Sequence, residues 1–208
     1  LVLLAFHRLR DAPGPWTGGA LGVALAVAAL ACGYYGIFAG CALGLLVLIY
    51  ADRSPKYWAA LLMAGLVAAA VVWPVFQAFT TARVASGAEL GPHTADEIRG
   101  YSSRASDYLA SSAVAHGWWM PALARSAPWV EVLFPGIGVV AFAALALVAA
   151  GRSASADRRA LAAYGLLAVV AAWASFGPAL KLYSVLEATV PGMSLIRAPA
   201  RFGVVVDF

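Results

Sequence analysis

The stretch that decides the fold is "WTGGALGVALAVAALACGYYGIFAGCALGLLVLIY", residues 16–50. It contains no charged residue and lacks the polar stripe, at 3.6-residue spacing, of a helix on a soluble core. A helix needs about 20 apolar residues to cross about 30 Å of hydrocarbon, so this stretch is too long for one crossing and long enough for two. Two glycines and two tyrosines in "CGYYG", residues 32–36, favour a turn at the lipid headgroups. We therefore predict spans at 16–32 and 34–51, joined as a hairpin.

The whole chain has the composition of a membrane protein. Hydrophobic residues make up 63% of it and charged residues 12%, whereas soluble domains have about 45–50% and about 25%. We predict an all-α fold, a polytopic transmembrane helical bundle with five complete spans in a single transmembrane domain. The remaining spans are expected at 57–80, 132–150 and 160–176, with partial spans at 1–6 and 201–208. Because both ends lie in apolar stretches, we expect the chain to be a fragment.

The positions of the basic residues predict the orientation. Short loops rich in Lys and Arg are usually cytoplasmic, and this assigns the cytoplasmic side to loops 7–15, 52–56 and 151–159. The hydrophilic loop 81–131 and the segment 177–200 then lie on the extracytoplasmic side of a plasma (inner) membrane. The net charge of +4 is explained by these loops, so we predict membrane lipids as partners and no nucleic acid.

Known catalytic motifs are absent from the sequence. It contains no Walker A loop, no HExxH and no CxxC. No complete predicted span carries an ionisable side chain, which argues against an ion-coupled transporter. His93 and His116 are too far apart in the sequence to predict a ligand pair. We predict no metal site and no cofactor, and no residue is assigned as catalytic; the sequence does not decide whether a divalent cation takes part.

The extracytoplasmic loop offers a candidate substrate site. Thr94 and Glu97 have the spacing of a capping box, which predicts a short helix beginning near Ala95. Arg104 and Asp107 follow this helix. Two interpretations stay open: a solvated helix on the membrane surface, or one wall of a substrate cavity.

The segment 177–200 is expected to hold an interfacial amphipathic helix, with Tyr183 on its apolar face and Glu187 off it. After it comes "SLIRAPARF", residues 194–202. Pro199 disfavours helix at the residue before it, so Arg197 and Arg201 are predicted to flank a turn.

Two roles are open for this arginine pair. Arginine binds phosphate through a planar fork of donors, so Arg197 and Arg201 could hold a lipid phosphate. Alternatively, they pair for structural reasons with Glu131, Glu187 or lipid headgroups. Glu131 stands directly before a predicted span, where an acid needs a partner or water.

Four stretches carry a resemblance to a known group: "ACGYYGIFAG", "YSSRASDYLASS", "EVLFPGIGVVAFAALAL" and "FGPALKLYSVLEATVPGMSLIRAPARF". In this order they resemble bacterial polytopic membrane proteins that are similar in layout to GT-C type glycosyltransferases. The resemblance covers residues 16–208, and "EVLFPG" and "RAPARF" are its most specific pieces. It implies hexosyl transfer from a polyprenyl-phosphate-linked sugar on the extracytoplasmic face. The family's acid would lie upstream of Leu1.

The expected function is therefore a GT-C-like glycosyltransferase, with Arg197, Arg201, Glu131, Arg104 and Asp107 as candidate substrate- or phosphate-binding residues. The alternative is a membrane transporter, or a lipid-handling or scaffold protein, without chemistry. The sequence does not specify the sugar, the acceptor or the oligomeric state.

Overall fold

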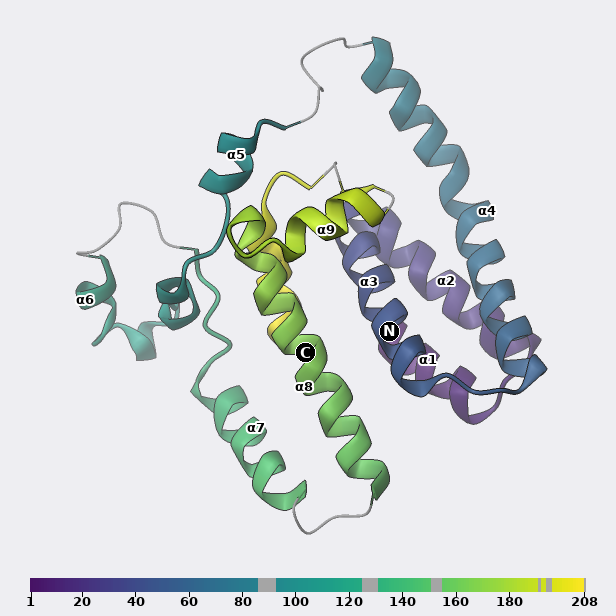
Figure 1. Cartoon of the computed structure of the whole chain (residues 1–208), viewed down its shortest axis with the longest axis horizontal. Coiled ribbons are helices and arrows are strands. Elements are labelled where there is room, and N and C mark those ends of the chain that lie inside the picture. Colours follow the sequence, from purple (N-terminus) through teal and green to yellow (C-terminus); the bar gives the residue numbers. More distant parts are fainter. Residues whose placement is uncertain (86–92, 125–130, 151–154, 191, 194–195, 208) are drawn as a thin grey trace. The chain divides into compact units, whose positions relative to one another are not determined.

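Most of the described part of the chain is helical. The computed structural model describes residues 1–85, 93–124, 131–150, 155–190, 192–193 and 196–207. No strand occurs among these residues, so the predicted all-α class is confirmed. The chain divides into two compact units, which we call the N-terminal unit (Leu1–Pro92) and the C-terminal unit (His93–Phe208). Figure 1 shows the helices of each unit.

The N-terminal unit contains four helices, α1 (Val2–Asp11), α2 (Pro15–Ala31), α3 (Gly33–Tyr50) and α4 (Pro55–Ala85). Helix α2 contacts each of the other three. The helices expected at 16–32, 34–51 and 57–80 are confirmed, although α4 runs further than predicted. Loop 7–15 was expected to be a polar connection, and this is wrong for its first part, because α1 continues to Asp11. Burial of Leu9 on the inner face of α1 accounts for the extra turn.

The predicted hairpin between α2 and α3 is confirmed. The helices are separated by Cys32 alone, whose extended backbone (φ −161°, ψ 125°) ends one helix and begins the next. As a result, the end of α3 returns to the end of α1: the Arg10 guanidinium lies 5.0 Å from the centre of the Tyr50 ring. The basic segments 7–15 and 52–56 therefore lie at the same end of this unit, as their assignment to one side of a membrane requires.

Small residues set the distance between α2 and α4. A Cβ atom added at Gly18 would lie 2.5 Å from the carbonyl oxygen of Ala60, and one at Gly22 would lie 2.6 Å from that of Ala64. The four-residue spacing of these glycines thus brings the two backbones close together. In α3, by contrast, a Cβ at Gly40 or Gly44 would meet nothing within 4 Å.

The C-terminal unit is built around the long helix α8 (Ser155–Ser175). The other elements are α5 (Ala95–Gly100), η2 (Ala105–Leu109), η3 (Val114–His116), α6 (Met120–Ala124), α7 (Ile137–Ala150), η4 (Gly177–Leu180), α9 (Leu182–Thr189) and η6 (Pro199–Asp207), where η denotes a 3₁₀ helix. Helix α8 contacts α7, α9, η4 and η6. Figure 1 shows α9 crossing the C-terminal end of α8.

Several predicted boundaries in this unit need correction. The span expected at 132–150 begins only at Ile137, because Leu133 and Phe134 donate backbone hydrogen bonds to the carbonyl oxygens of Asp107 and Ala110 (3.1 Å each). The helix expected at 160–176 begins earlier, at Ser155, inside the predicted loop 151–159. The first residues of that loop, 151–154, lie outside the described residues.

At the C-terminal end, residues 201–207 of the partial span expected at 201–208 belong to a 3₁₀ helix, η6, which begins at Pro199; Phe208 lies outside the described residues. The amphipathic helix expected in 177–200 is confirmed as α9. It is separated from η4 by Lys181, whose left-handed backbone (φ 63°) breaks the helix in two.

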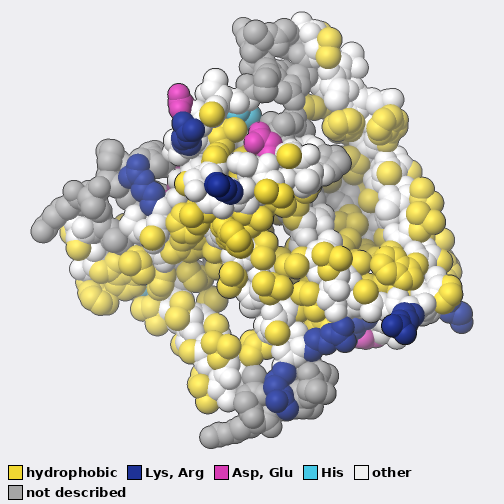
Figure 2. Space-filling model, viewed as in Figure 1, with side chains coloured by type: hydrophobic (Ala, Val, Ile, Leu, Met, Phe, Trp, Pro, Cys, Tyr) yellow, Lys and Arg dark blue, Asp and Glu magenta, His cyan; other side chains and the backbone are white. Residues whose placement is uncertain are grey.

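Two of the described helices, α3 and α4, are long and apolar enough to cross a membrane, and α2 and α7 are shorter apolar helices. Only 11% of the apolar window of α4 is buried. Figure 2 shows hydrophobic side chains along the outer surface of α4. A helix that is apolar all round and mostly exposed differs from a soluble core helix, which is mostly buried.

Candidate functional site

The site begins at the N-terminus of α5. The helix starts at Ala95, as predicted, and the Thr94 side chain accepts a hydrogen bond from the backbone N–H of Glu97 (3.2 Å). Only this half of the predicted capping box forms. The Glu97 carboxylate instead contacts His93, directly before the cap, and Arg197, from another segment.

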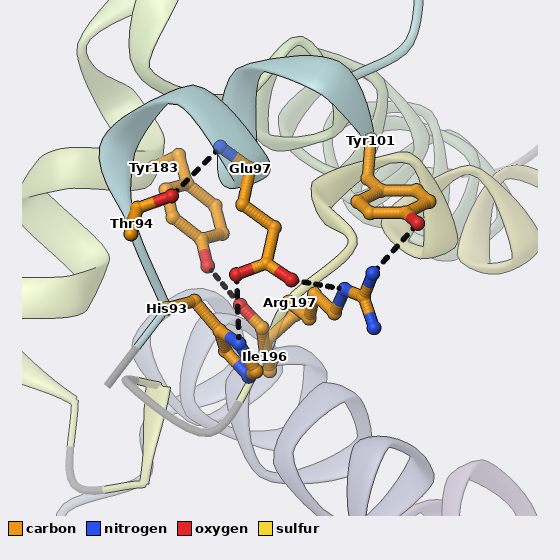
Figure 3. Close-up of polar contacts among 7 residues, drawn as sticks. All are labelled: His93, Thr94, Glu97, Tyr101, Tyr183, Ile196 and Arg197. Carbon is orange, nitrogen blue, oxygen red and sulfur yellow. Dashed lines mark hydrogen bonds and ion pairs between the residues drawn. The ribbon is translucent and has the colours of Figure 1, made fainter. Parts of the chain in front are cut away.

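Glu97 holds a cation from the far end of the chain (Figure 3). Its carboxylate lies 2.8 Å from Nε of Arg197 and 3.4 Å from Nδ1 of His93. Nη2 of Arg197 donates to the Tyr101 hydroxyl (2.7 Å), and the guanidinium carbon lies 4.5 Å from the centre of that ring. Because Arg197 is 45% exposed, solvent screens the ion pair and its contribution to stability is modest.

The backbone around Arg197 is fixed by buried hydrogen bonds. The Tyr183 hydroxyl donates to the carbonyl oxygen of Ile196 (2.6 Å), and Ala200 N–H donates to that of Tyr101 (3.1 Å). Arg201 N–H donates to the carbonyl oxygen of Ala198 across Pro199 (3.2 Å). The chain turns at Pro199, as predicted, but Arg201 lies inside η6 and does not flank the turn. The alanines and the proline of "RAPAR" are buried, and both arginine side chains are exposed.

A cluster of hydroxyl groups connects residues 103–108 to the C-terminal end of α8. Ser175 donates to the carbonyl oxygen of Ala172 (2.6 Å) and therefore accepts from Ser103 (2.6 Å) and Tyr108 (2.7 Å). Directly after this helix, Gly177 has a positive φ of 64°, and a Cβ there would collide with the Ser102 side chain. Residues 102–108 are thus held against the C-terminal end of α8.

These elements surround a pocket of about 450 Å³. This volume lies within the usual range for small-molecule sites. The pocket is lined by Glu97, Gly100, Tyr101, Ser102, Arg104, Asp107 and Glu131.

Asp107 is the most enclosed charged group of this lining, with 2% of its surface exposed. One carboxylate oxygen, Oδ2, accepts a hydrogen bond from the backbone N–H of Arg104 (2.7 Å) and caps the turn η2. The other oxygen, Oδ1, is buried and has no hydrogen-bond partner among the described residues. A buried acceptor without a donor is costly and calls for an explanation.

The pocket gathers three of the five residues singled out from the sequence. Arg104, Asp107 and Glu131 line it, although Glu131 is distant from the other two in sequence. Arg197 does not line the pocket but binds two residues that do, whereas Arg201 is exposed and is not part of the lining.

Sequence reasoning missed the role of Glu97. The expected acidic partners of Arg197 were Glu131 and Glu187, and the structure pairs Arg197 with Glu97 instead. The capping-box pattern correctly placed Glu97 in the first turn of α5. In such a box, however, the carboxylate would accept from the backbone N–H of Thr94 and would not bind Arg197. His93 joins the same carboxylate, which the sequence did not indicate.

His116 lies in a separate aromatic cluster. Its Nδ1 is 2.7 Å from the Ser111 hydroxyl, and its ring stacks on Trp119 at 4.8 Å between centroids. Among the described residues, no group of three or more His, Cys, Asp or Glu is arranged to hold a metal ion.

No protein-family model matches the chain, and neither the curated proteins nor the solved structures include one that matches it.

Proposed function

We propose that the protein is a multi-pass membrane protein of the cell envelope. The support comes from α4 and α7, each of which exposes large apolar side chains from one end to the other, for example Trp58 at 49% and Phe79 at 45% in α4 and Phe142 at 75% in α7. Soluble monomers rarely expose apolar patches of more than a few hundred Å². Such apolar helices are stable when lipid acyl chains cover their exposed side chains. We include in this proposal the bundle of five spans in the inner membrane that the sequence predicts.

The polar groups of the C-terminal unit support the orientation proposed from the sequence. Arg158 and Arg159 lie near the start of α8, and Ser175, which anchors the pocket segment, ends it. The apolar part of α8, residues 160–175, extends about 24 Å beyond these arginines and would lie in the lipid. In this arrangement 151–159 is cytoplasmic, and the pocket opens on the extracytoplasmic side.

We infer that the pocket serves GT-C-like transfer of a hexose from a polyprenyl phosphate. In this reaction an acceptor hydroxyl attacks the anomeric carbon, its proton passes to a carboxylate, and the lipid phosphate leaves. A base and a cation near the leaving phosphate are therefore needed. The observation that carries the proposal is a single pocket that combines the carboxylates of Asp107 and Glu131 with Arg104.

Among the arginines, Arg104 is best suited to meet the leaving phosphate. Two donor groups of Arg197 are engaged by Glu97 and Tyr101. The guanidinium of Arg104 makes no hydrogen bond or ion pair within the described ranges and lines the pocket. Arg201 stands four residues beyond Arg197, on the other side of the Pro199 turn.

The test is a transfer assay on the full chain in detergent or vesicles, with polyprenyl-phosphate hexoses as donors. We expect Arg104→Gln to lower turnover by about tenfold or more, since one charge-assisted contact to the leaving phosphate is lost. Arg197→Ala and Arg201→Ala are assayed beside it. Arg99→Gln is the matched control, because Arg99 lies in the same region but is outside the pocket lining and pairs with the exposed Asp96.

Wild-type protein that binds these lipids without transferring sugar would favour the lipid-handling or transport alternative. Equal turnover in Arg104→Gln and wild type would remove Arg104 from the mechanism.

A further inference from the structure

We propose that residues 109–122, which we call the aromatic loop, insert their exposed apolar side chains into the outer surface of the membrane. The sequence places these residues in a hydrophilic loop, so a lipid-binding surface is not expected there. Insertion from the extracytoplasmic side rests on the orientation proposed above, whereas the affinity for lipid follows from the loop itself.

The aromatic loop presents apolar side chains and no fixed charge. Residues 108–124 contain no Asp, Glu, Lys or Arg. Three large apolar side chains of the loop are exposed: Val114 at 96%, Trp118 at 78% and Leu109 at 55%. Figure 2 shows hydrophobic side chains gathered at the left of the view, where Figure 1 places α6. Several exposed apolar side chains within one short segment are unfavourable in water and mark a surface that an apolar phase covers.

Polar side chains of the loop bond to partners within it. Nδ1 of His116 lies 2.7 Å from the Ser111 hydroxyl, and the indole N–H of Trp119 donates to the carbonyl oxygen of Leu109 (2.8 Å). The His116 ring also stacks on Trp119. Because these groups are paired internally, the loop can enter the headgroup region without leaving them unpaired.

The base of the loop lies close to one end of α7. The Phe134 N–H donates to the carbonyl oxygen of Ala110 (3.1 Å), and α7 begins three residues after Phe134, at Ile137. Three residues of chain reach at most about 10 Å. In the proposed orientation this end of α7 lies at the extracytoplasmic headgroups, because its other end leads into the cytoplasmic loop 151–159. Tryptophan is enriched at that depth, and interfacial segments bury apolar side chains about 5–10 Å into it.

A lipid surface fits the loop better than a protein partner does. Protein interfaces usually surround an apolar centre with a polar rim that specifies the partner. Between Val114 and Trp118 the loop has only Ala115, His116 and Gly117, and Nδ1 of His116 is already bonded to a residue of the loop. The headgroup region needs no such match, since it surrounds the apolar body of a Trp ring and accepts from its N–H.

The experiment measures whether lipid or water surrounds the loop. In the full-length protein, Cys32 and Cys41 are replaced by alanine, and Val114→Cys carries a nitroxide spin label. The protein is reconstituted into vesicles of phosphatidylcholine and phosphatidylglycerol. Collisions of the label with oxygen, which concentrates in lipid, are compared with collisions with a water-soluble nickel chelate.

We expect the oxygen-to-nickel ratio at Val114→Cys to be at least about threefold higher than at Ala95→Cys, because polar complexes are excluded from lipid. Ala95 is the matched control, since it is exposed and lies in α5, outside the aromatic loop. Equal ratios at the two positions would overturn the insertion.

A second measurement changes the exposed ring. In the labelled Val114→Cys protein, Trp118→Ser should lower the ratio towards that of Ala95→Cys, whereas Trp118→Phe should keep it high. Trp118 is mostly exposed, so neither substitution should change the thermal midpoint. Equal ratios in the two Trp118 variants would contradict anchoring by this ring.

A label at Phe142, an exposed residue of α7, separates this proposal from that of the membrane spans. Lipid contact at Phe142 with water contact at Val114 overturns the insertion and leaves the span intact. Lipid contact at Val114 alone supports the aromatic loop and contradicts α7 as a span, and water contact at both positions contradicts both proposals. A Val114 label shielded from both reagents would show that a second copy or another protein covers the loop, which also overturns the insertion.

Discussion

In the N-terminal unit, α2 and α4 contact each other closely through glycine and alanine, whereas in the C-terminal unit polar side chains connect short and irregular segments. Gly18 and Gly22 bring two backbones together over successive turns of α2. Around α8, the segments are connected by hydrogen bonds among the hydroxyl groups of Ser103, Tyr108 and Ser175 and by backbone hydrogen bonds.

The difference shows how a site can be built in a chain with so few polar residues. Uniform packing of apolar helices leaves no polar group to line a cavity. In the C-terminal unit, 3₁₀ turns interrupt the helices and leave polar groups unpaired within them. The Arg104 N–H holds Asp107, and the Arg197 side chain holds Glu97. The following substitutions test this comparison.

The largest effect is expected at Gly177. Alanine there must adopt a positive φ, which costs about 1–2 kcal/mol, and its Cβ would collide with Ser102. Gly177→Ala should therefore destabilise the C-terminal unit by about 2–4 kcal/mol, measured by thermal or denaturant unfolding in detergent. The control is Gly165→Ala, where a Cβ meets nothing within 4 Å. Equal midpoints for the two variants would contradict the close approach.

The next effect is expected at the contact between α2 and α4. In Gly22→Ala the new methyl would lie 2.6 Å from the Ala64 carbonyl and 2.7 Å from Cβ of Val67, so the helices must separate. We expect a loss of about 1–3 kcal/mol in the free energy of unfolding. Gly40→Ala in α3 is the matched control and should be neutral or stabilising. If both variants behave alike, packing through small residues is not what holds this unit.

A similar or smaller effect is expected from Ser175→Ala. This change removes the acceptor of two hydroxyl groups in a fully buried position. Loss of this acceptor for the buried Ser103 hydroxyl costs about 1–3 kcal/mol, which unfolding measurements can detect. Ser184→Ala on the exposed face of α9 should leave the midpoint unchanged.

The smallest effect concerns the pH dependence of the N-terminal unit. Burial, assisted by the nearby Arg10, lowers the pKa of His7 below its ordinary value of 6.5. The unfolded chain therefore binds a proton more readily than the folded one, and stability is lost as pH falls through about 6.5. The thermal midpoint of wild type should fall more between about pH 7.5 and 5.5 than that of His7→Gln. Identical slopes would contradict this assignment.

The two units also differ in how far the sequence predicts them. Residues 16–50 predict α2, α3 and the break at Cys32 because an apolar helix depends on local composition and length alone. The start of α7 was predicted too early, since the extended conformation of Leu133 is set by a hydrogen bond to Asp107, distant in sequence. Local pattern carries no information about that partner.

The same reason separates the parts of the site. The cap at Thr94 is local and was predicted. The pairing of Glu97 with Arg197 joins residues 100 positions apart, and no sequence pattern links them. That Oδ1 of Asp107 has no hydrogen-bond partner within the described ranges becomes visible only when the burial of each atom is known.

The one-residue break at Cys32 has a consequence for how the chain is made. Because α2 and α3 are separated by a single extended residue, no stretch between them is long enough to be handled as a separate loop during synthesis. The tip, Cys32 to Gly36, contains no charged side chain that would have to leave water. In a bilayer, the two helices would therefore enter together as one folded unit, and a lysine placed at Tyr34 would impede that entry more than it would disturb the finished protein.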